Sequence, residues 1–212
     1  MLDAARIAAL LRPFADVSDE LANQLSIYLD LLLRWNARIN LTAVRDPEQI
    51  VTRHFGESLF AARVLRDAGA FNASVGRPTL SDIGSGAGFP GIPIKLAEPE
   101  IHLTLIESQN KKATFLREVI RTLGLTGAGV FCGRAETRTQ KSSVVILRAV
   151  ENFEETLPIA AGLVEPPGMI GLLIGANQVA TAQSVLSPTW RLSDPLSIPT
   201  SRERVILVGE VT

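Results

Sequence analysis

From residue 79 onward the chain alternates short apolar runs with helical patterns, and this alternation restricts the fold more than any other feature of the sequence. The clearest helix begins at Asn110 and stops at Gly124, with its apolar side chains on one face. Strands that alternate with helices of this length predict an α/β fold with a mostly parallel, twisted sheet and helices on both faces. The apolar runs that predict its strands are Thr79–Ile83, Ile101–Ile106, Gly129–Cys132, Ser143–Leu147, Met169–Ile174 and Arg204–Val208.

The residues before this alternation have a helical pattern. Between Ser18 and Asn36 the apolar residues fall on one stripe of a helix, and Ser18 occupies the position of an N-cap. Shorter helices are predicted over Asp3–Leu11 and in parts of Pro47–Asp67. Together these segments predict a helical N-terminal cap.

A stretch of turn-forming residues separates the two patterns. Asn72, Ser74 and Gly76 lie between residues 69 and 78 and are typical of a hinge. We therefore expect a cap over residues 1–70 and a core over residues 71–212, joined in one compact unit.

Composition places the chain among soluble globular proteins. Apolar residues make up 46% of the chain and charged residues 20%. Cys132 is the only cysteine, so no disulfide indicates an oxidising compartment. The N-terminus lacks a basic segment followed by an apolar run, and polar residues interrupt the uncharged run 166–190, so neither a leader nor a membrane span is predicted. We expect a cytoplasmic protein.

The formal net charge of −1 conceals an uneven distribution. Residues 95–148 contain nine Lys/Arg and five Asp/Glu, whereas residues 149–212 contain three and seven. A positive middle third suits a polyanionic partner, because phosphate contacts depend on local rather than total charge. Ordinary solvated helix faces would produce the same pattern.

A glycine-rich turn follows the first predicted strand. It runs from Asp82 to Gly91 and contains Gly84, Gly86 and Gly88, which allow tight turns and close approach of a ligand. The next predicted strand is followed by Glu107, nineteen residues after Gly88. A carboxylate at this position can accept hydrogen bonds from the ribose hydroxyls of a nucleoside ligand.

Two cofactor classes use this layout, and charge distinguishes them. The run from Gly86 to Gly91 matches the dinucleotide pattern, but Pro90 removes an N–H donor that a pyrophosphate would need, and Asp82 would repel it. The carboxylate suits a ligand with an ammonium and a sulfonium, because unit charges about 4 Å apart attract by roughly 4 kcal/mol at an effective dielectric constant near 20. The sequence therefore favours S-adenosyl-L-methionine over NAD.

The ends of later strands extend this site. Ala135 and Glu136 follow the third predicted strand, where backbone groups can bracket an adenine ring, although a plain surface turn has the same residues. Arg148 ends the fourth strand, at the carboxyl edge where open α/β sheets bind ligands. Neither an (Asp/Asn)-Pro-Pro-aromatic motif nor a Pro-Cys nucleophile is present, and Cys132 is expected to be buried within its strand.

These residues suit methylation of an acceptor that carries no proton. N7 of guanine presents a lone pair and carries no proton, so its attack on the methyl group needs no general base. Alignment of the two reactants in a pocket without water can supply most of the rate enhancement. Arg148 is a candidate to orient the base, because arginine reads the O6 edge of guanine. A structural salt bridge is the alternative role for this side chain.

Together, several segments resemble one family, the bacterial small-subunit ribosomal RNA methyltransferase G family, also called glucose-inhibited division protein B. The matching segments are Trp35–Thr42, Arg53–Leu59, Asp82–Pro93, Glu107-Ser108 with Lys111-Lys112 and Phe115-Leu116, Gly133–Glu136 and Arg148-Ala149. The resemblance implies a Rossmann-like class I methyltransferase with a seven-stranded sheet, and it implies transfer of methyl from S-adenosyl-L-methionine to N7 of a guanosine in the 530 loop of 16S rRNA. The implied partners are 16S rRNA or the 30S subunit, with no membrane and no metal.

The resemblance also assigns residues to the site. It places Gly84, Phe89, Ala135, Glu136 and Arg148 at cofactor-contacting positions, to which Asp82, Gly86 and Gly88 are added from the loop and Glu107 as the candidate that binds the ribose. Asn36, Asn40, Thr42 and His54 would belong to a cap against the active-site face, and Lys111 and Lys112 are further candidates for contact with the substrate. Capping and hydrogen bonds between segments are the alternative roles of the cap residues.

The sequence departs from the family pattern at two places. Ile174 stands where a lysine is common, and Ser142 and Ser143 occupy a region where an aspartate is usual. Because a missing basic group weakens contacts with nucleic acid, two alternatives stay open. They are a methyltransferase of small molecules and a ribosome-associated binding protein with weakened catalysis.

Overall fold

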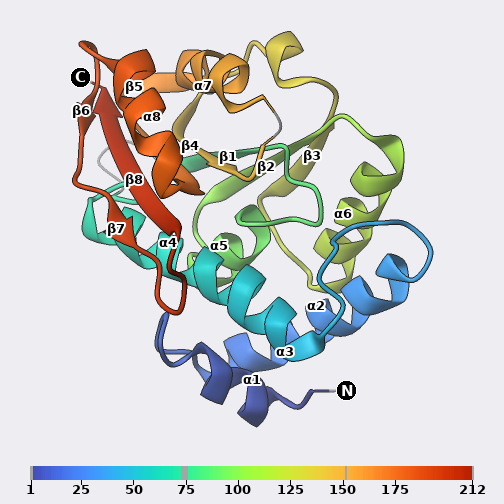
Figure 1. Ribbon diagram of the computed structural model, residues 1–212. Coiled ribbons are helices and arrows are strands. Elements are labelled where there is room, and N and C mark those ends of the chain that lie inside the picture. The colour runs from blue at the N-terminus through green and yellow to red at the C-terminus, as the bar shows by residue number, and fades with distance from the viewer. Residues whose placement is uncertain (1, 73–75, 151, 212) are drawn as a thin grey trace.

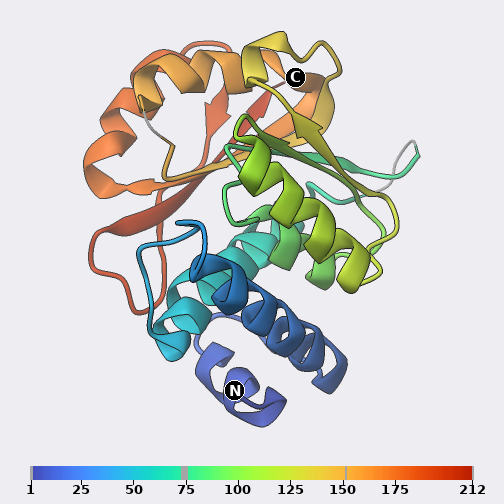
Figure 2. The ribbon, with the colours of Figure 1, turned by 90° about the vertical axis from the view of Figure 1, so that its right-hand side faces the viewer.

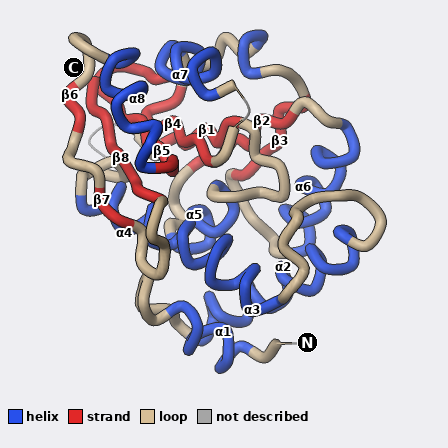
Figure 3. Tube along the Cα trace, in the orientation of Figure 1, coloured by secondary structure: helices blue, strands red, loops and turns tan. Residues whose placement is uncertain are grey.

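A single mixed sheet organises the part of the chain that this computed structural model describes, which comprises residues 2–72, 76–150 and 152–211. Among these residues it contains eight strands in the order β3-β2-β1-β4-β5-β8-β6, and β7 also pairs with β8 (Figures 1 and 3). The first five are parallel, and β8 runs antiparallel to β5. The strands are β1 (Thr79–Ile83), β2 (His102–Glu107), β3 (Ala128–Cys132), β4 (Ser142–Arg148), β5 (Val164–Gly175), β6 (Arg191–Leu192), β7 (Leu196–Ser197) and β8 (Arg204–Val211).

The predicted α/β class and mostly parallel sheet are confirmed, but the described residues form eight strands where the resemblance implied seven and the apolar runs indicated six. Each of the six apolar runs forms a strand, and β5 starts earlier than expected, at Val164. The two additional strands, β6 and β7, contain two residues each, which is too short for a pattern of alternating apolar residues to show.

Helices cover both faces of the sheet. Helices α4, α5 and α6 pack on one face, and α7 and α8 pack on the other, as the two views in Figures 1 and 2 show. The central helices are α4 (Glu57–Asp67), α5 (Gly91–Ala97), α6 (Asn110–Thr122), α7 (Phe153–Gly162) and α8 (Val179–Leu186), with short 3-10 turns η2 (Ala135–Thr137) and η3 (Ala176–Gln178).

Of the helical cap expected over residues 1–70, α4 packs directly on the sheet, and the part before α4 lies outside α4, α5 and α6. It contains α1 (Ala4–Leu11), α2 (Asp19–Asn36), α3 (Pro47–Ile50) and the π-helix η1 (Val51–Gly56). Ser18 caps α2 as predicted, because its hydroxyl accepts a hydrogen bond from the N–H of Leu21 at 3.2 Å. The π-helix was not predicted, since its wider turn leaves no separate pattern in six residues.

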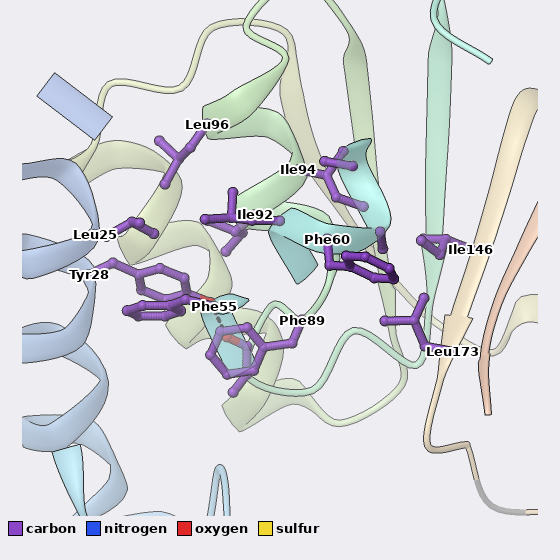
Figure 4. Packing of buried hydrophobic residues seen from close by; sticks show 14 of the residues in the cluster. Leu25, Tyr28, Phe55, Phe60, Phe89, Ile92, Ile94, Leu96, Ile146 and Leu173 are labelled. Atoms are coloured by element: carbon purple, nitrogen blue, oxygen red, sulfur yellow. Dashed lines mark hydrogen bonds between the residues drawn. The ribbon is translucent and has the colours of Figure 1, made fainter. Parts of the chain in front are cut away.

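Cap and sheet share one apolar cluster. Leu29 of α2, Leu105 of β2 and Ile146 of β4 are buried members of the same cluster, and Figure 4 shows Leu25 and Tyr28 of α2 facing it. The packing is therefore continuous across residue 70, and the division into cap and core remains a prediction. Of the expected hinge residues, Gly76 has a left-handed φ of +75°, and Ser74 lies outside the described residues.

Cys132 was expected to be buried, but it is exposed because β3 is an edge strand. Its thiol donates a hydrogen bond to Oδ1 of Asn110 at 3.1 Å.

Among the described residues, each helix is too short or too polar to cross a bilayer. The uncharged run 166–190 forms most of β5, η3 and α8 instead.

Packing of α2 on the shared cluster predicts a large effect of core truncation in the cap. Leu25 is fully buried, so Leu25→Ala should lower the free energy of unfolding by about 2–5 kcal/mol in chemical denaturation. Ile27, on the same helix, is 47% exposed, and Ile27→Ala should change it by less than about 0.5 kcal/mol. Equal effects of the two substitutions would contradict the packing described for α2.

Candidate cofactor cleft and the junction between cap and sheet

The glycine turn connects the end of β1 to the start of α5. Gly84, Gly86 and Gly88 have φ values of +68°, +56° and +93°, in the left-handed region that other residues avoid. A Cβ on Gly88 would lie 2.4 Å from Cδ1 of Ile92 and 2.5 Å from the hydroxyl of Tyr28. The turn is therefore packed tightly against both α5 and the cap.

Backbone N–H groups of the turn bind acceptors within the protein. Those of Gly84 and Ser85 donate to the carbonyl of Ile106, and those of Gly88 and Phe89 donate to the carbonyl of Ser85. The N–H groups of residues 86 and 91 donate to carboxylates, and Pro90 has none. Six donors of the turn are thus already used, which leaves little for a pyrophosphate.

Three side chains from three elements hold the turn. Glu107 of β2 accepts hydrogen bonds from Gly86 N (3.0 Å) and Gln109 N (2.8 Å). Asp82 of β1 accepts one from Gly91 N at 3.1 Å, and Tyr28 of α2 donates its hydroxyl proton to the carbonyl of Ala87. Tyr28 was missed from the sequence, where it is one apolar position on the stripe of α2.

Asp82 lies beneath the turn rather than in a cleft. The side chain is fully buried, its Oδ1 has no partner among the described residues, and burial raises its pKa to about 7. Alternation along β1 explains this, since it directs Asp82 to the face covered by α5 and the cap. The negative charge expected from the sequence is consequently weakened near neutral pH.

On the other side of the turn a cleft of about 500 Å³ opens at the carboxyl ends of β1 to β4. Its walls combine apolar side chains with three carboxylates, a composition suited to a nucleoside with a cationic substituent. The apolar walls are formed by Ile83, Ile106, Val150 and Ile159; the carboxylates are Glu107, Glu136 and Glu155; Lys112 and Arg134 lie at the same cleft. A Cβ on Gly84 would contact Cγ1 of Val150 at 3.4 Å.

The structure brings together five of the nine predicted cofactor residues in this cleft. They are Gly84, Gly86, Glu107, Ala135 and Glu136. Asp82, Gly88, Phe89 and Arg148 are outside its lining and lie toward the cap. Glu155 and Ile159, from α7, were missed because that helix follows the site in sequence and carries no motif.

Phe89 belongs to an aromatic cluster between the turn and the cap. Its ring stacks on His54 with a centroid distance of 4.8 Å and lies 5.6 Å from Tyr28. Tyr28 in turn stacks on Phe55 of η1 at 5.2 Å, and Figure 4 shows these rings side by side. The cap thus contacts the turn through rings from α2 and η1.

Arg148 is the centre of a polar network in the same junction. Its Nη2 lies within hydrogen-bonding distance of the carbonyl of Arg53 (2.8 Å), Nδ1 of His54 (3.0 Å) and Oε2 of Glu57 (3.0 Å), so its two N–H groups are shared among three acceptors. Glu57 is 2% exposed and also pairs with Arg204 of β8. The Glu57 carboxylate therefore links Arg148 of β4 and Arg204 of β8 to the start of α4. This is the structural salt bridge expected as the alternative role of Arg148.

His54 is neutral in this network. Burial, followed by the charge of Arg148, lowers its pKa to about 3. Since Nδ1 accepts from Arg148, the proton lies on Nε2, which is 2.8 Å from Oγ1 of Thr42. A fixed neutral ring at this position supports packing and orientation rather than proton transfer.

The remaining cap residues shape the loop after α2. Oδ1 of Asn36 accepts from the N–H groups of Leu41 and Thr42, and its amide donates to the carbonyl of Thr42. Oδ1 of Asn40 accepts from Arg45 at 3.0 Å. These contacts match the alternative role as hydrogen bonds between segments.

The two lysines of α6 differ in position. Lys112 lines the cleft, whereas Lys111 is exposed on the adjacent surface.

No group of His, Cys, Asp and Glu in the described part of the chain is arranged to hold a metal ion.

Comparison with known proteins finds a family and a fold. Residues 21–194 match the family model described as rRNA small subunit methyltransferase G. Ribosomal RNA small subunit methyltransferase G of Xylella fastidiosa (strain 9a5c) is 37% identical over 190 residues, which cover 85% of this chain and 83% of that protein. The protein of that name from Myxococcus xanthus (strain DK1622) is 36% identical over 76% of this chain and 73% of its own length.

Solved structures share the fold at low sequence identity. TrmN from Thermus thermophilus has a TM-score of 0.60 at 16% identity, covering 76% of this chain and 53% of that chain. A SAM dependent methyltransferase from Aquifex aeolicus has a TM-score of 0.59 at 15% identity, covering 79% and 94%. The expected methyltransferase fold is thereby confirmed.

The buried Asp82 predicts a pH-dependent difference between the protein and its Asp82→Asn variant. Because the folded pKa of about 7 exceeds the unfolded value of 3.8, the folded state retains a proton that the unfolded state loses, and stability falls as pH rises across this interval. The free energy of unfolding of Asp82→Asn minus that of the parent protein should therefore increase from pH 4 to pH 7. His54 contributes in the opposite direction, since its pKa is lowered, but equally in both proteins. A difference that stays constant or shrinks with pH would contradict the assignment.

The position of Glu57 between two arginines predicts a strong effect of neutralising it. Glu57→Gln leaves two partly buried guanidinium groups without a counter-charge and should lower the unfolding free energy by about 3 kcal/mol. Glu98 pairs with the more exposed Arg66, and Glu98→Gln should cost less than about 1 kcal/mol. Denaturant titrations of both variants measure this, and a loss for Glu57→Gln no larger than the control would refute the network's contribution.

Proposed function

Because this chain belongs to the rRNA small subunit methyltransferase G family, we propose that it transfers the methyl group of S-adenosyl-L-methionine to N7 of a guanosine in the 530 loop of 16S rRNA. The observation that carries the cofactor assignment is the use of six N–H groups of the glycine turn by internal acceptors. A pyrophosphate would need those donors, whereas a sulfonium nucleoside does not.

The cleft fits the nucleoside part of this cofactor. Ile83, Ile106 and Ile159 offer apolar walls for an adenine ring, and Glu107 lies where ribose hydroxyls need an acceptor. Glu107 already accepts two backbone hydrogen bonds, but each carboxylate oxygen has a second lone pair. When bound, the cofactor supplies an electrophilic methyl group.

The junction with the cap suits the acceptor base. Arg148 is fixed by three acceptors, so a base that reaches it meets a cation whose orientation is already set. N7 of guanine carries no proton, and the neutral, hydrogen-bonded His54 has no transfer to perform. Orientation and exclusion of water are what these residues contribute.

Two finer assignments are part of the proposal. The substrate is 16S rRNA, free or within the 30S subunit, and the reaction takes place in the cytoplasm. The relatives named as ribosomal RNA methyltransferases support the first of these.

The two alternatives make different demands on the structure. A methyltransferase of small molecules would need a closed pocket, whereas this cleft is open beside Lys112 and Arg134. A weakened binding protein would follow from the loss of a lysine at position 174. However, Ile174 is 5% exposed within the apolar cluster beneath α7 and α8 and is outside the cleft lining.

The cofactor assignment is tested by titration of the purified protein with S-adenosyl-L-methionine and, separately, with NAD. We expect saturable binding of the first and none of the second, because the donors of the turn are occupied. Preferential binding of NAD would refute the assignment.

The substrate assignment is tested by mass spectrometry of nucleosides from 16S rRNA and 30S particles incubated with protein and cofactor. We expect one 7-methylguanosine, located in the 530 loop. An unmodified loop together with intact cofactor binding would favour the weakened binding protein, and RNA binding that ignores added salt would favour a small-molecule substrate.

A further inference from the structure

The end of α2 and the loop that follows it carry positive charge without acidic residues. Residues 31–45 contain three arginines, Arg34, Arg38 and Arg45, and no aspartate or glutamate. All three are exposed. Such a segment has a local field that the net charge of −1 does not reveal.

Two further cations are brought beside this segment by packing. Trp35 of α2 lies 5.6 Å from Phe115 of α6, between ring centroids, and Figure 2 shows these helices side by side. Lys111 is exposed one turn before Phe115, on the same side of α6. On the other side, the contact between Thr42 and His54 places the exposed Arg53 next to the loop.

These five residues form what we name the cap strip: Arg34, Arg38, Arg45, Arg53 and Lys111. Within the described residues none of them forms an ion pair, in contrast to Arg6, Arg66, Arg77, Arg134, Arg148, Arg191 and Arg204. The nearest acid after the segment, Asp46, accepts a hydrogen bond from Gln49 N as the N-cap of α3. The positive charge of the strip is therefore not neutralised by ion pairs among the described residues, and it is available to bind an anionic partner.

The loop that carries the strip is held in place by its own hydrogen bonds. Asn36 binds the backbone of Leu41 and Thr42, and Arg45 donates to the carbonyl of Asn36 (2.9 Å) and to Oδ1 of Asn40 (3.0 Å). A charged loop whose conformation is already ordered binds with a smaller entropic cost.

We propose that the cap strip binds the phosphate backbone of the RNA on the side of the target base, an inference that rests on the proposed function. The strip borders the junction where His54 stacks on Phe89 and Arg148 is anchored. Spaced, unpaired cations match the regular charges of a polynucleotide. A protein partner would require apolar anchors, and the large apolar residues that are exposed in residues 2–72, 76–150 and 152–211, namely Ile27, Val185 and Leu196, are outside the strip.

The test compares glutamine substitutions in the strip with a matched control. Arg38→Gln, Arg45→Gln and the combined replacement of all five residues are measured beside Arg12→Gln. Arg12 is an exposed arginine at the end of α1 for which the described part of the chain offers no ion-pair partner. Each protein is titrated with 16S rRNA over 50–200 mM salt and, separately, with S-adenosyl-L-methionine. Circular dichroism establishes that each variant is folded.

Each single strip variant should reduce the slope of log affinity against log salt by about 0.7–0.9, and the combined variant by about 3 or more. Arg12→Gln should leave the slope unchanged, and all variants should bind the cofactor as the parent does. Unchanged slopes in the folded strip variants, or an equal change in Arg12→Gln, would overturn the proposal.

Failure of the proposed function has a different signature. In that case the parent protein itself would not methylate 16S rRNA, or would bind it without salt dependence. A parent that methylates the RNA while the combined variant does so with an unaltered KM for RNA would refute the strip alone.

Discussion

The site depends on the internal saturation of the glycine turn. Asp82, Glu107 and Tyr28 come from two strands and a cap helix, and each binds a backbone group of the turn. The two carboxylates take the N–H groups of Gly86 and Gly91, and four further N–H groups of the turn bind the carbonyls of Ile106 and Ser85, so six donors that would attract a phosphate are in use. The turn held in this way separates the cleft on the α7 side from the junction on the cap side. Selectivity for a sulfonium nucleoside, as proposed, therefore results from how the turn is held as much as from the charge nearby.

Much of the fold could be predicted because it follows from local periodicity. All six apolar runs are strands, and the stripe from Ser18 to Asn36 is α2 within one residue at its start. The five predicted residues that line the cleft sit at the carboxyl end of β2 or within a few residues after β1 and β3, where strand polarity alone places them at one edge. Motifs tied to a strand end were informative because their position in space follows from the topology.

The parts that could not be predicted depend on contacts between distant segments. Glu57 is a buried acid at the start of α4, and nothing in the sequence indicates that its partners are Arg148 and Arg204. Asp82 was expected to face the ligand, whereas the alternation of β1 turns it under α5, where a Cβ on Gly91 would lie 2.8 Å from its Oδ2. The prediction that Cys132 is buried was wrong because the sequence does not indicate which strand forms the edge of the sheet.

The close approach at Gly88 has a consequence for how such chains diverge. With a left-handed φ of +93° and the Tyr28 hydroxyl 2.5 Å from where a Cβ would be, this position has no room for even one methyl group. Relatives that keep a large aromatic residue at the place of Tyr28 must keep glycine here, and those that lose the glycine must reshape α2 or the Ile92 side chain as well. A contact between two positions sixty residues apart in the chain thus restricts which residues position 88 can accept.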